Sequence, residues 1–194
     1  MIRDANATRQ RLISAAQTEF AAFGIAGARV DRIALNSGSN KAQIYHYFGN
    51  KDALYDAVWQ NLVSQVLSET TIDVRDLPGY AARLADLYAA HPEFIRLIAW
   101  QRLERSEGRS LPLSVSNIEA HIAAIAQAQA DGIVTDRFEA GTLYAMILHL
   151  ATLWGDMSPD VRVVVGTPEA SERASTVSRA VASILAPPSE PGVG

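Results

Sequence analysis

The feature that most constrains this chain is a pair of short helical segments joined by a glycine-containing turn near the N-terminus. Residues 30–37 carry apolar side chains at three- and four-residue steps, which predicts a short helix with Val30, Ile33 and Ala34 on its inward face. The turn at residues 37–39 (Ser-Gly-Ser) follows, and Asn40 is a residue type that caps the N-terminus of a helix. Two short helices joined in this way form a helix-turn-helix unit.

A longer helix is expected to precede this unit. Its apolar positions recur at four- and three-residue steps between residues 8 and 23, and they are Leu12, Ala16, Phe20 and Phe23. Gly24 follows directly and takes the position at which glycine commonly ends a helix. Residues 1–6 precede the pattern and are expected to be a mobile arm.

The third segment, residues 40–48, combines aromatic and polar side chains on one short helix. A projection at 100° per residue places Ile44 and Phe48 on the inward side. The other sides then carry the candidate contact residues Lys41, Ala42, Gln43, Tyr45, His46 and Tyr47. A glutamine amide can pair with the edge of adenine in a major groove, an alanine leaves room for a thymine methyl, and tyrosine hydroxyls suit phosphates. The segment therefore predicts a helix that reads DNA.

The next helix begins with a further candidate contact. Asn50 is expected to cap this helix, and Lys51 stands in its first turn. A lysine suits a phosphate, as do the free N–H groups at a helix N-terminus. Taken singly, Tyr45 and Tyr47 could equally be packed aromatic residues, and Lys51 or His46 an ordinary solvated side chain. Only the whole arrangement favours DNA.

Together these residues resemble the DNA-binding head of the TetR (tetracycline-repressor-like) family. The shared frame covers roughly residues 8–58 and ends in the run Ile-Tyr-x-x-Phe-x-x-Lys-x-x-Leu from Ile44 to Leu54. The resemblance implies a helix-turn-helix regulator that dimerises and responds to a small ligand. It also implies that residues 41–43 and 45–47 occupy contact positions of the recognition helix, and that Lys51 occupies the position of a phosphate-binding lysine.

Two positions depart from the family's pattern. The family often opens its second helix with two hydroxyl residues, where this chain has Ala28 and Arg29. A charged phosphate contact from Arg29 is therefore expected in place of the hydroxyl contact. Asn40 stands where a serine usually precedes the recognition-helix lysine, and it still serves as a cap.

The charge distribution agrees with a DNA-binding head on an acidic body. The chain has a formal net charge of −4, but residues 1–55 hold seven Lys/Arg against four Asp/Glu and are net +3, whereas the remainder is net −7. The absence of cysteine excludes disulfides and agrees with a reducing cytosol. No apolar run reaches the roughly 20 residues of a membrane span, and the N-terminus lacks the apolar core of a signal peptide, so a cytoplasmic location is expected.

The rest of the chain is helical in pattern, with no alternating strand run. Further helices are expected near residues 51–69, 78–90, 92–106, 114–131, 136–154 and 168–186. Residues 167–169 (Thr-Pro-Glu) are expected to start the last one. The sequence thus predicts an all-α fold of about nine helices. The predicted domains are a helix-turn-helix head over residues 1–50, a larger helical effector-binding and dimerisation bundle over residues 51–186, and a disordered tail over residues 187–194.

Two of these helices are candidates for a dimer interface. Residues 136–154 carry a wide apolar surface, and residues 168–186 carry a smooth face of small and aliphatic side chains. A homodimer in which both helices pair with their copies would bury these surfaces, and the resemblance implies the same arrangement. Alternatively, the helix at 136–154 is simply the central core helix; both statements can hold.

Polar and aromatic side chains on otherwise apolar faces are candidates for an effector pocket. They are Tyr88, Trp100, Gln101, His121 and Tyr144, with the apolar neighbours Ile125 and Ile147. A buried polar group needs a partner, which can be a ligand, a neighbouring side chain or water. Mostly apolar surroundings with a few polar anchors predict a small, largely apolar or aromatic effector. For each residue alone, a core position satisfied by a neighbour is the more common outcome.

The leading prediction is a homodimeric, ligand-responsive transcriptional regulator, preferably a repressor of a palindromic DNA operator, without cofactor or metal. An enzyme is the first alternative, because His121 with Glu119, Glu104 or His149 could form a base or metal pair. No catalytic motif or orienting third group supports it, however. A helical protein that binds another protein through its C-terminal face, without specific DNA binding, is the second alternative.

Overall fold

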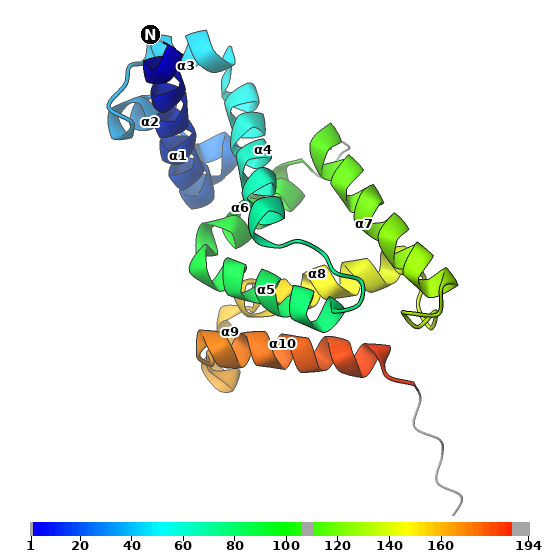
Figure 1. Cartoon of the computed structure of the whole chain (residues 1–194). Helices are drawn as coiled ribbons and strands as arrows, with labels where there is room; N and C mark the ends of the chain where they lie inside the picture. Colours follow the sequence, from blue (N-terminus) through cyan, green and yellow to red (C-terminus); the bar gives the residue numbers. More distant parts are fainter. Residues whose placement is uncertain (1, 106–110, 188–194) are drawn as a thin grey trace, which may run out of the picture. The chain divides into compact units, whose positions relative to one another are not determined.

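The computed structural model describes residues 2–105 and 111–187, which form ten α-helices and no strand (Figure 1). The helices are α1 (Ile2–Gly27), α2 (Val30–Asn36), α3 (Lys41–Phe48), α4 (Lys51–Glu69), α5 (Leu77–Ala90), α6 (Pro92–Glu104), α7 (Pro112–Ala130), α8 (Ala140–Asp156), α9 (Pro159–Val165) and α10 (Ala170–Leu185). The all-α prediction is confirmed, and the expected number of about nine helices is one too low for these residues. Within the same part of the chain, no helix has both the length and the apolar run that crossing a bilayer requires.

The additional helix is α9, over a valine-rich segment whose composition alone favours a strand. The hydroxyl of Ser158 accepts a hydrogen bond from the N–H three residues later, and Pro159 occupies the first turn, so the helix start is well defined. The prediction that residues 167–169 start the last helix in the same way, with a capping residue followed by a proline, is wrong. There α10 begins at Ala170, without a side-chain cap hydrogen bond.

Helix packing divides the chain into two compact units. The head unit consists of Met1–Leu67 and His91–Val115 and contains α1 to α3, most of α4, and α6. The second unit consists of Ser68–Ala90 and Ser116–Gly194 and contains α5, α8, α9, α10 and most of α7. The head thus includes two helices, α4 and α6, beyond the DNA-binding domain predicted from sequence, whose boundaries stay a prediction. The predicted tail lies outside the described residues, except for Pro187.

The core of the head unit forms along α1. Leu12, Ala16 and Phe20 are fully buried, as the helical pattern predicts. Phe20 packs edge-on against Tyr55 of α4, with the ring centroids 5.1 Å apart. Phe23 is 48% exposed, so its predicted inward position is wrong. It faces α2 at the edge of the core, where a guanidinium lies 4.2 Å above its ring.

Helix α1 begins earlier than predicted but breaks at the predicted residue. Residues 2–6 are helical, so the expected mobile arm is wrong for them, and residue 1 lies outside the described range. Gly24 has φ 70° and ψ −176°, which interrupts the regular helix before a last turn that reaches Gly27. Glycine adopts this backbone conformation without the steric cost that other residues meet.

The core of the second unit forms where α5, α8 and α10 pack on one another. Helix α8 contributes the buried Leu143 and Ile147, and α10 contributes the buried Val177 and Val181. Part of the apolar surface predicted for dimerisation is therefore already covered within one chain.

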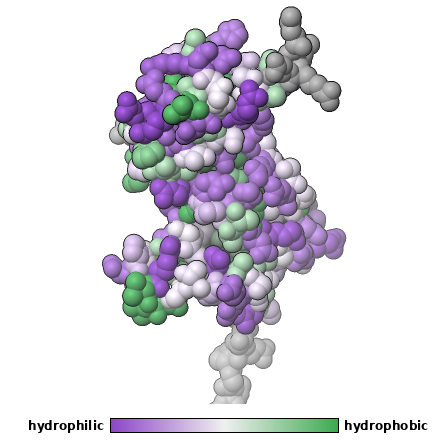
Figure 2. All heavy atoms as spheres, turned by 90° about the vertical axis from the view of Figure 1, so that its left-hand side faces the viewer, coloured by the Kyte–Doolittle hydropathy of each residue, from purple (hydrophilic) through white to green (hydrophobic). Residues whose placement is uncertain are grey.

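Helix α9 presents an uncovered apolar surface. Val163 and Val164 are each 86% exposed, and Val161 and Val165 are about half exposed. Figure 2 shows a group of apolar side chains at its lower left, on the side of the molecule where α9 lies in Figure 1. Contiguous exposed apolar side chains mark a surface that another molecule can cover.

Candidate nucleic-acid interface

The recognition helix α3 is fixed at its N-terminus by a reciprocal pair of hydrogen bonds. The backbone N–H of Gln43 donates to Oδ1 of Asn40 at 2.9 Å, and the backbone N–H of Asn40 donates to Oε1 of Gln43 at 3.2 Å. This capping box satisfies two N–H groups that the start of a helix leaves unpaired. Asn50 caps α4 in a simpler way, because its Oδ1 accepts from the N–H of Ala53 at 2.8 Å. Both predicted caps are confirmed.

One side of α3 is buried and the other sides are open. Ile44 is fully buried, as predicted, whereas Phe48 is only half-buried, with the guanidinium of Arg9 5.4 Å from its ring. The exposed residues of this helix are Lys41, Ala42, Gln43, Tyr45 and His46. The half-buried ring of Tyr47 meets the ring of His46 edge-on at 5.4 Å. The open sides therefore present an amide, an imidazole and two phenols together.

A buried carboxylate from α1 holds the start of α2. Glu19 is 4% exposed and accepts hydrogen bonds from the backbone N–H of Arg29 at 2.8 Å and from Nε of Arg32 at 2.7 Å. Burial pushes the pKa of Glu19 upward, but the hydrogen bonds and the charge of Arg32, with the N–H of Arg29, outweigh it and hold that pKa below its ordinary value. The side chain of Arg29 remains exposed, as a phosphate contact requires.

The two lysines predicted to contact DNA are held differently. Lys41 is exposed and pairs with Asp31 of α2 at 3.2 Å. Lys51 is half-buried, and its Nζ donates to the carbonyls of Ala26 and Ala28, each at 3.3 Å. An ammonium group has three N–H donors, so one donor of Lys51 is left for a phosphate oxygen.

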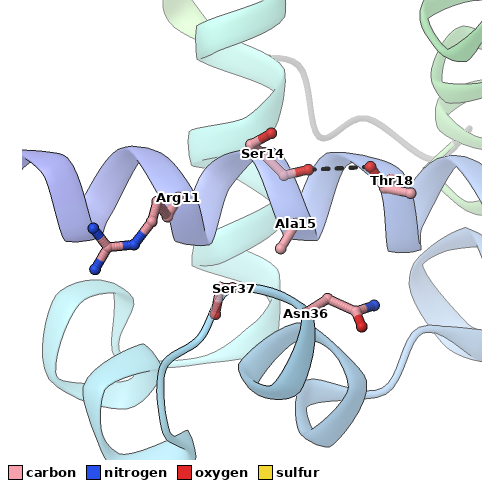
Figure 3. A pocket seen from close by; sticks show the side chains of 6 residues that line it. All are labelled: Arg11, Ser14, Ala15, Thr18, Asn36 and Ser37. Carbon is pink, nitrogen blue, oxygen red and sulfur yellow. Dashed lines mark hydrogen bonds between the residues drawn. The ribbon is translucent and has the colours of Figure 1, made fainter.

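A hollow of about 400 Å³ lies between α1 and the end of α2 (Figure 3). It is lined by Arg11, Ser14, Ala15, Thr18, Asn36 and Ser37. The hydroxyl of Thr18 donates to the carbonyl of Ser14 at 3.3 Å, and the hydroxyl of Ser37 donates to the carbonyl of Ala34 at 3.0 Å. These hydroxyl groups are thus part of the helical frame of the head, and not of the open face of α3.

Two residues predicted for the effector pocket lie on α6, in the head unit. Trp100 donates from Nε1 to the carbonyl of Ala21 in α1 at 3.3 Å. Gln101 is half-buried, and its buried Oε1 has no hydrogen-bond partner among the residues that the structure describes. The position of Trp100 is therefore explained by packing within the head.

The other predicted pocket residues lie in the second unit, where three helices bring polar rings together. Nδ1 of His121 on α7 is 2.9 Å from the hydroxyl of Tyr144 on α8, and the ring of His121 meets Tyr80 of α5 edge-on at 6.2 Å. Burial lowers the pKa of His121, raises the pKa of Tyr144, and raises the pKa of the half-buried Tyr88 to about 12. The apolar members of the predicted set are fully buried, and they are Ile125 and Ile147.

Several residues that organise these sites are not found from the sequence. They are Glu19, Arg32, Tyr80, Arg96, Glu104 and Arg105, whose side chains contact other helices or helix starts within their own unit. Glu104, for example, bonds to a backbone N–H that lies 79 positions earlier in the chain. A charged side chain on the polar side of an amphipathic helix carries no sign of a partner at that distance, so the periodicity of α6 could not reveal the contact.

Comparison with known proteins places the chain in a family. Residues 12–58 match the family described as bacterial regulatory proteins, tetR family, and residues 76–183 match the tetracyclin repressor-like C-terminal domain. The chain is 37% identical over 168 residues to the HTH-type transcriptional repressor SCO4008 of Streptomyces coelicolor. The matched region covers 84% of this chain and 86% of that protein. It is 28% identical to the HTH-type transcriptional repressor NicS of Pseudomonas putida, over 76% of each chain.

A solved structure agrees with this relationship. The transcriptional regulator SCO4942 of Streptomyces coelicolor has a TM-score of 0.83 and 35% identity, covering 93% of this chain and 99% of that one. The two matched regions cover the helix-turn-helix and most of the second unit. The chain therefore belongs to the TetR family of ligand-responsive, DNA-binding transcriptional regulators, which are not enzymes.

Proposed function

We propose that the protein is a homodimeric repressor that binds a palindromic operator through α3 and is released from it by a small effector. The observation that carries this proposal is the open side of α3, where polar and aromatic side chains follow a fully formed capping box. Two recognition helices set about 34–36 Å apart would enter successive major grooves. The relatives named above are repressors, which supports repression over activation. The operator also implies action in the cytoplasm, where a bacterial chromosome lies.

The contact residues divide into base readers and phosphate contacts. Gln43 and Ala42 are proposed to read bases, with the amide of Gln43 paired to an adenine and the methyl of Ala42 against a thymine. In the free protein Oε1 of Gln43 is engaged in the capping box, so bidentate pairing requires this oxygen to be shared or released on binding. Arg29 and Lys51 are proposed to bind phosphates, together with the hydroxyls of Tyr45 and Tyr47.

The dimer interface is proposed on α8 and α10. Their inner faces are covered within the chain, so the interface has to use the sides that remain open. On α8 these sides carry the half-buried Met146 and Leu150 and the 40% exposed Leu153, and on α10 they carry the half-buried Ala180 and Ile184. Apolar side chains left partly open on two helices are the kind of surface that a two-fold interface covers.

The effector is proposed to bind in the second unit, near His121 and Tyr144. These two polar rings, with Tyr80, come from three different helices, and Ile125 and Ile147 on the helices of His121 and Tyr144 are fully buried. A small apolar or aromatic molecule with one hydrogen-bonding group could replace the 2.9 Å contact between His121 and Tyr144 with contacts of its own. An effector that prefers one arrangement of the chain over another would lower operator affinity by that difference in binding free energy. For Trp100 and Gln101, a contact with the effector stays a prediction from the sequence.

The first test is selection of bound sequences from a pool of random duplex DNA, followed by a salt titration. A short palindrome should be enriched, and its affinity should fall steeply as the salt concentration rises, because bound phosphates release counterions. Binding without any enriched sequence would contradict the proposed operator. Once the operator is known, compounds that raise the melting temperature of the protein and release it from the operator would identify the effector class.

A further inference from the structure

Helix α6 carries a row of three side chains that face α1 at the point where α1 breaks. Arg96, Trp100 and Glu104 are four residues apart, so they lie on one side of the helix. All three form hydrogen bonds with the backbone between residues 21 and 26, within the head unit. We call these three residues the α6 row.

The α6 row supplies the hydrogen bonds that the break takes away from α1. In an uninterrupted helix the N–H groups of Ile25 and Ala26 would donate to the carbonyls of Ala21 and Ala22, four residues earlier. Gly24 has non-helical dihedral angles, and these N–H groups donate instead to Oε2 of Glu104, at 2.6 and 3.1 Å.

The two carbonyl groups are satisfied from the same row. Nε of Arg96 donates to the carbonyl of Ala21 at 2.6 Å, and a terminal nitrogen of Arg96 donates to the carbonyl of Ala22 at 3.3 Å. Nε1 of Trp100 adds a second donor to Ala21, also at 3.3 Å. Two donors and two acceptors released by the break therefore all find partners on one helix.

The space at the break also fits the row. A Cβ atom built on Gly24 would lie 2.6 Å from Oε1 of Glu104 and 2.8 Å from the indole ring of Trp100, which is closer than a real Cβ can approach. The glycine thus allows both the backbone conformation and the approach of α6.

The residue after the row holds a second helix of the head. The side chain of Arg105 is 6% exposed, pairs with Asp56 and lies 3.4 Å from Asp52, both on α4. Its guanidinium also lies 4.5 Å above the ring of Tyr55. Glu104 and Arg105 are adjacent and of opposite charge, and they fix α1 and α4, the two helices that flank the helix-turn-helix in the chain.

We propose that the α6 row and Arg105 are positioning residues for DNA binding: they splint the break in α1 and set the orientation in which α3 meets the operator. This inference rests on the proposed homodimer, because the distance between two recognition helices matters only when two heads bind together. The row touches the backbone of α1 and none of the contact residues proposed on α3, so it acts on DNA through the placement of the head.

Hydrogen exchange on the full-length protein tests the splint without DNA. In Glu104→Gln, which keeps the size of the side chain but loses its charge, the amides of Ile25 and Ala26 should exchange about tenfold faster. The amides of residues 12–20 should keep their protection. Leu103→Gln is the matched control, because Leu103 lies on the same turn and is 72% exposed. Unchanged exchange at both amides in Glu104→Gln would overturn the splint.

Operator spacing tests the positioning role. Affinity is measured for the selected palindrome and for versions with one base pair added to or removed from the centre. The wild-type protein and Leu103→Gln should prefer one spacing, and Glu104→Gln and Trp100→Phe should reduce that preference by about threefold or more. An equal loss of affinity at every spacing, or no change, would overturn the inference, because a role in stability alone does not depend on spacing. If the wild-type protein selects no palindrome, the proposed function fails and the DNA role of the row with it, whereas faster exchange would still establish the splint.

Discussion

Replacing Glu19 with glutamine should destabilise the head unit by about 2 kcal/mol at neutral pH. Breaking a buried ion pair by removing one partner costs roughly 3–5 kcal/mol. Two features lower this figure. The side chain of Arg32 is 38% exposed, so water can solvate part of its charge, and a glutamine oxygen can still accept from the N–H of Arg29.

The effect should depend on pH with a defined sign. The pKa of Glu19 in the folded chain lies below its ordinary value of 4.5, so the unfolded chain binds the proton more readily. The stabilisation by Glu19 is therefore complete above pH 4.5 and is lost as the pH falls through the folded pKa. Glu19→Gln cannot titrate, so its difference from the wild-type protein should be largest at pH 7 and should shrink in acid.

Urea unfolding followed by tryptophan fluorescence measures this difference. In a Trp154→Phe background the remaining tryptophans, Trp59 and Trp100, both report on the head unit. Asp31→Asn is the control, because Asp31 is 62% exposed in its pair with a lysine and should change stability by less than about 0.5 kcal/mol. A difference below about 0.5 kcal/mol for Glu19→Gln at pH 7, or an equal difference at pH 7 and at pH 4, would refute the reasoning.

Four further predictions follow from the structure. Gln43→Ala should reduce the free-energy difference between the correct and the wrong base at one operator position by about 1–3 kcal/mol. Lys51→Ala should weaken binding to every DNA sequence and reduce the slope of log affinity against log salt concentration by about one. Equal losses of affinity on every sequence in both variants would contradict these roles. Gly24→Ala should lower the stability of the head by about 2–4 kcal/mol in urea unfolding, because its Cβ would meet two side chains of α6 and its φ is +70°. Burial lowers the pKa of His121, so its imidazole should titrate below 6.5 by NMR, and the second unit should lose stability as the pH falls from 6.5 towards that pKa. Leu153→Arg should shift the proposed dimer towards monomer in sedimentation, and an unchanged mass would contradict an interface on this side of α8.

Much of the head could be predicted because its signals are local. Ile33 and Ile44 are buried where the helical period places them, and Asn40 caps a helix that starts at the next residue. The open sides of α3 follow from the same period. The inward position predicted for Phe23 is wrong because Phe23 stands next to the break at Gly24, and its ring lies beside Arg32 of α2.

The features that could not be predicted depend on contacts between residues that are distant in sequence, or on local surroundings that override the secondary-structure propensity of a segment. Valines favour strands, but the cap at Ser158 and the proline after it start a helix at α9. Trp100 has the aromatic and polar character of a pocket residue, and its sequence position does not reveal that its N–H bonds to the carbonyl of Ala21 in α1. Glu19 and Glu104 are charged residues on amphipathic helices, and only the packed chain shows which backbone N–H groups they accept from.

The α6 row has a consequence for engineered regulators in which the DNA-binding head of one protein is joined to the sensing unit of another. A junction at residue 50 would transfer α1 with its break and leave behind the helix that closes it. The two N–H groups and two carbonyl groups between residues 21 and 26 would then lose their hydrogen bonds to Arg96 and Glu104, unless the α6 of the other protein carries equivalent side chains. A graft that carries residues 91–105 together with the head keeps α1 and α6 in the same molecule with their hydrogen bonds. The compact unit that contains the helix-turn-helix is therefore discontinuous in sequence.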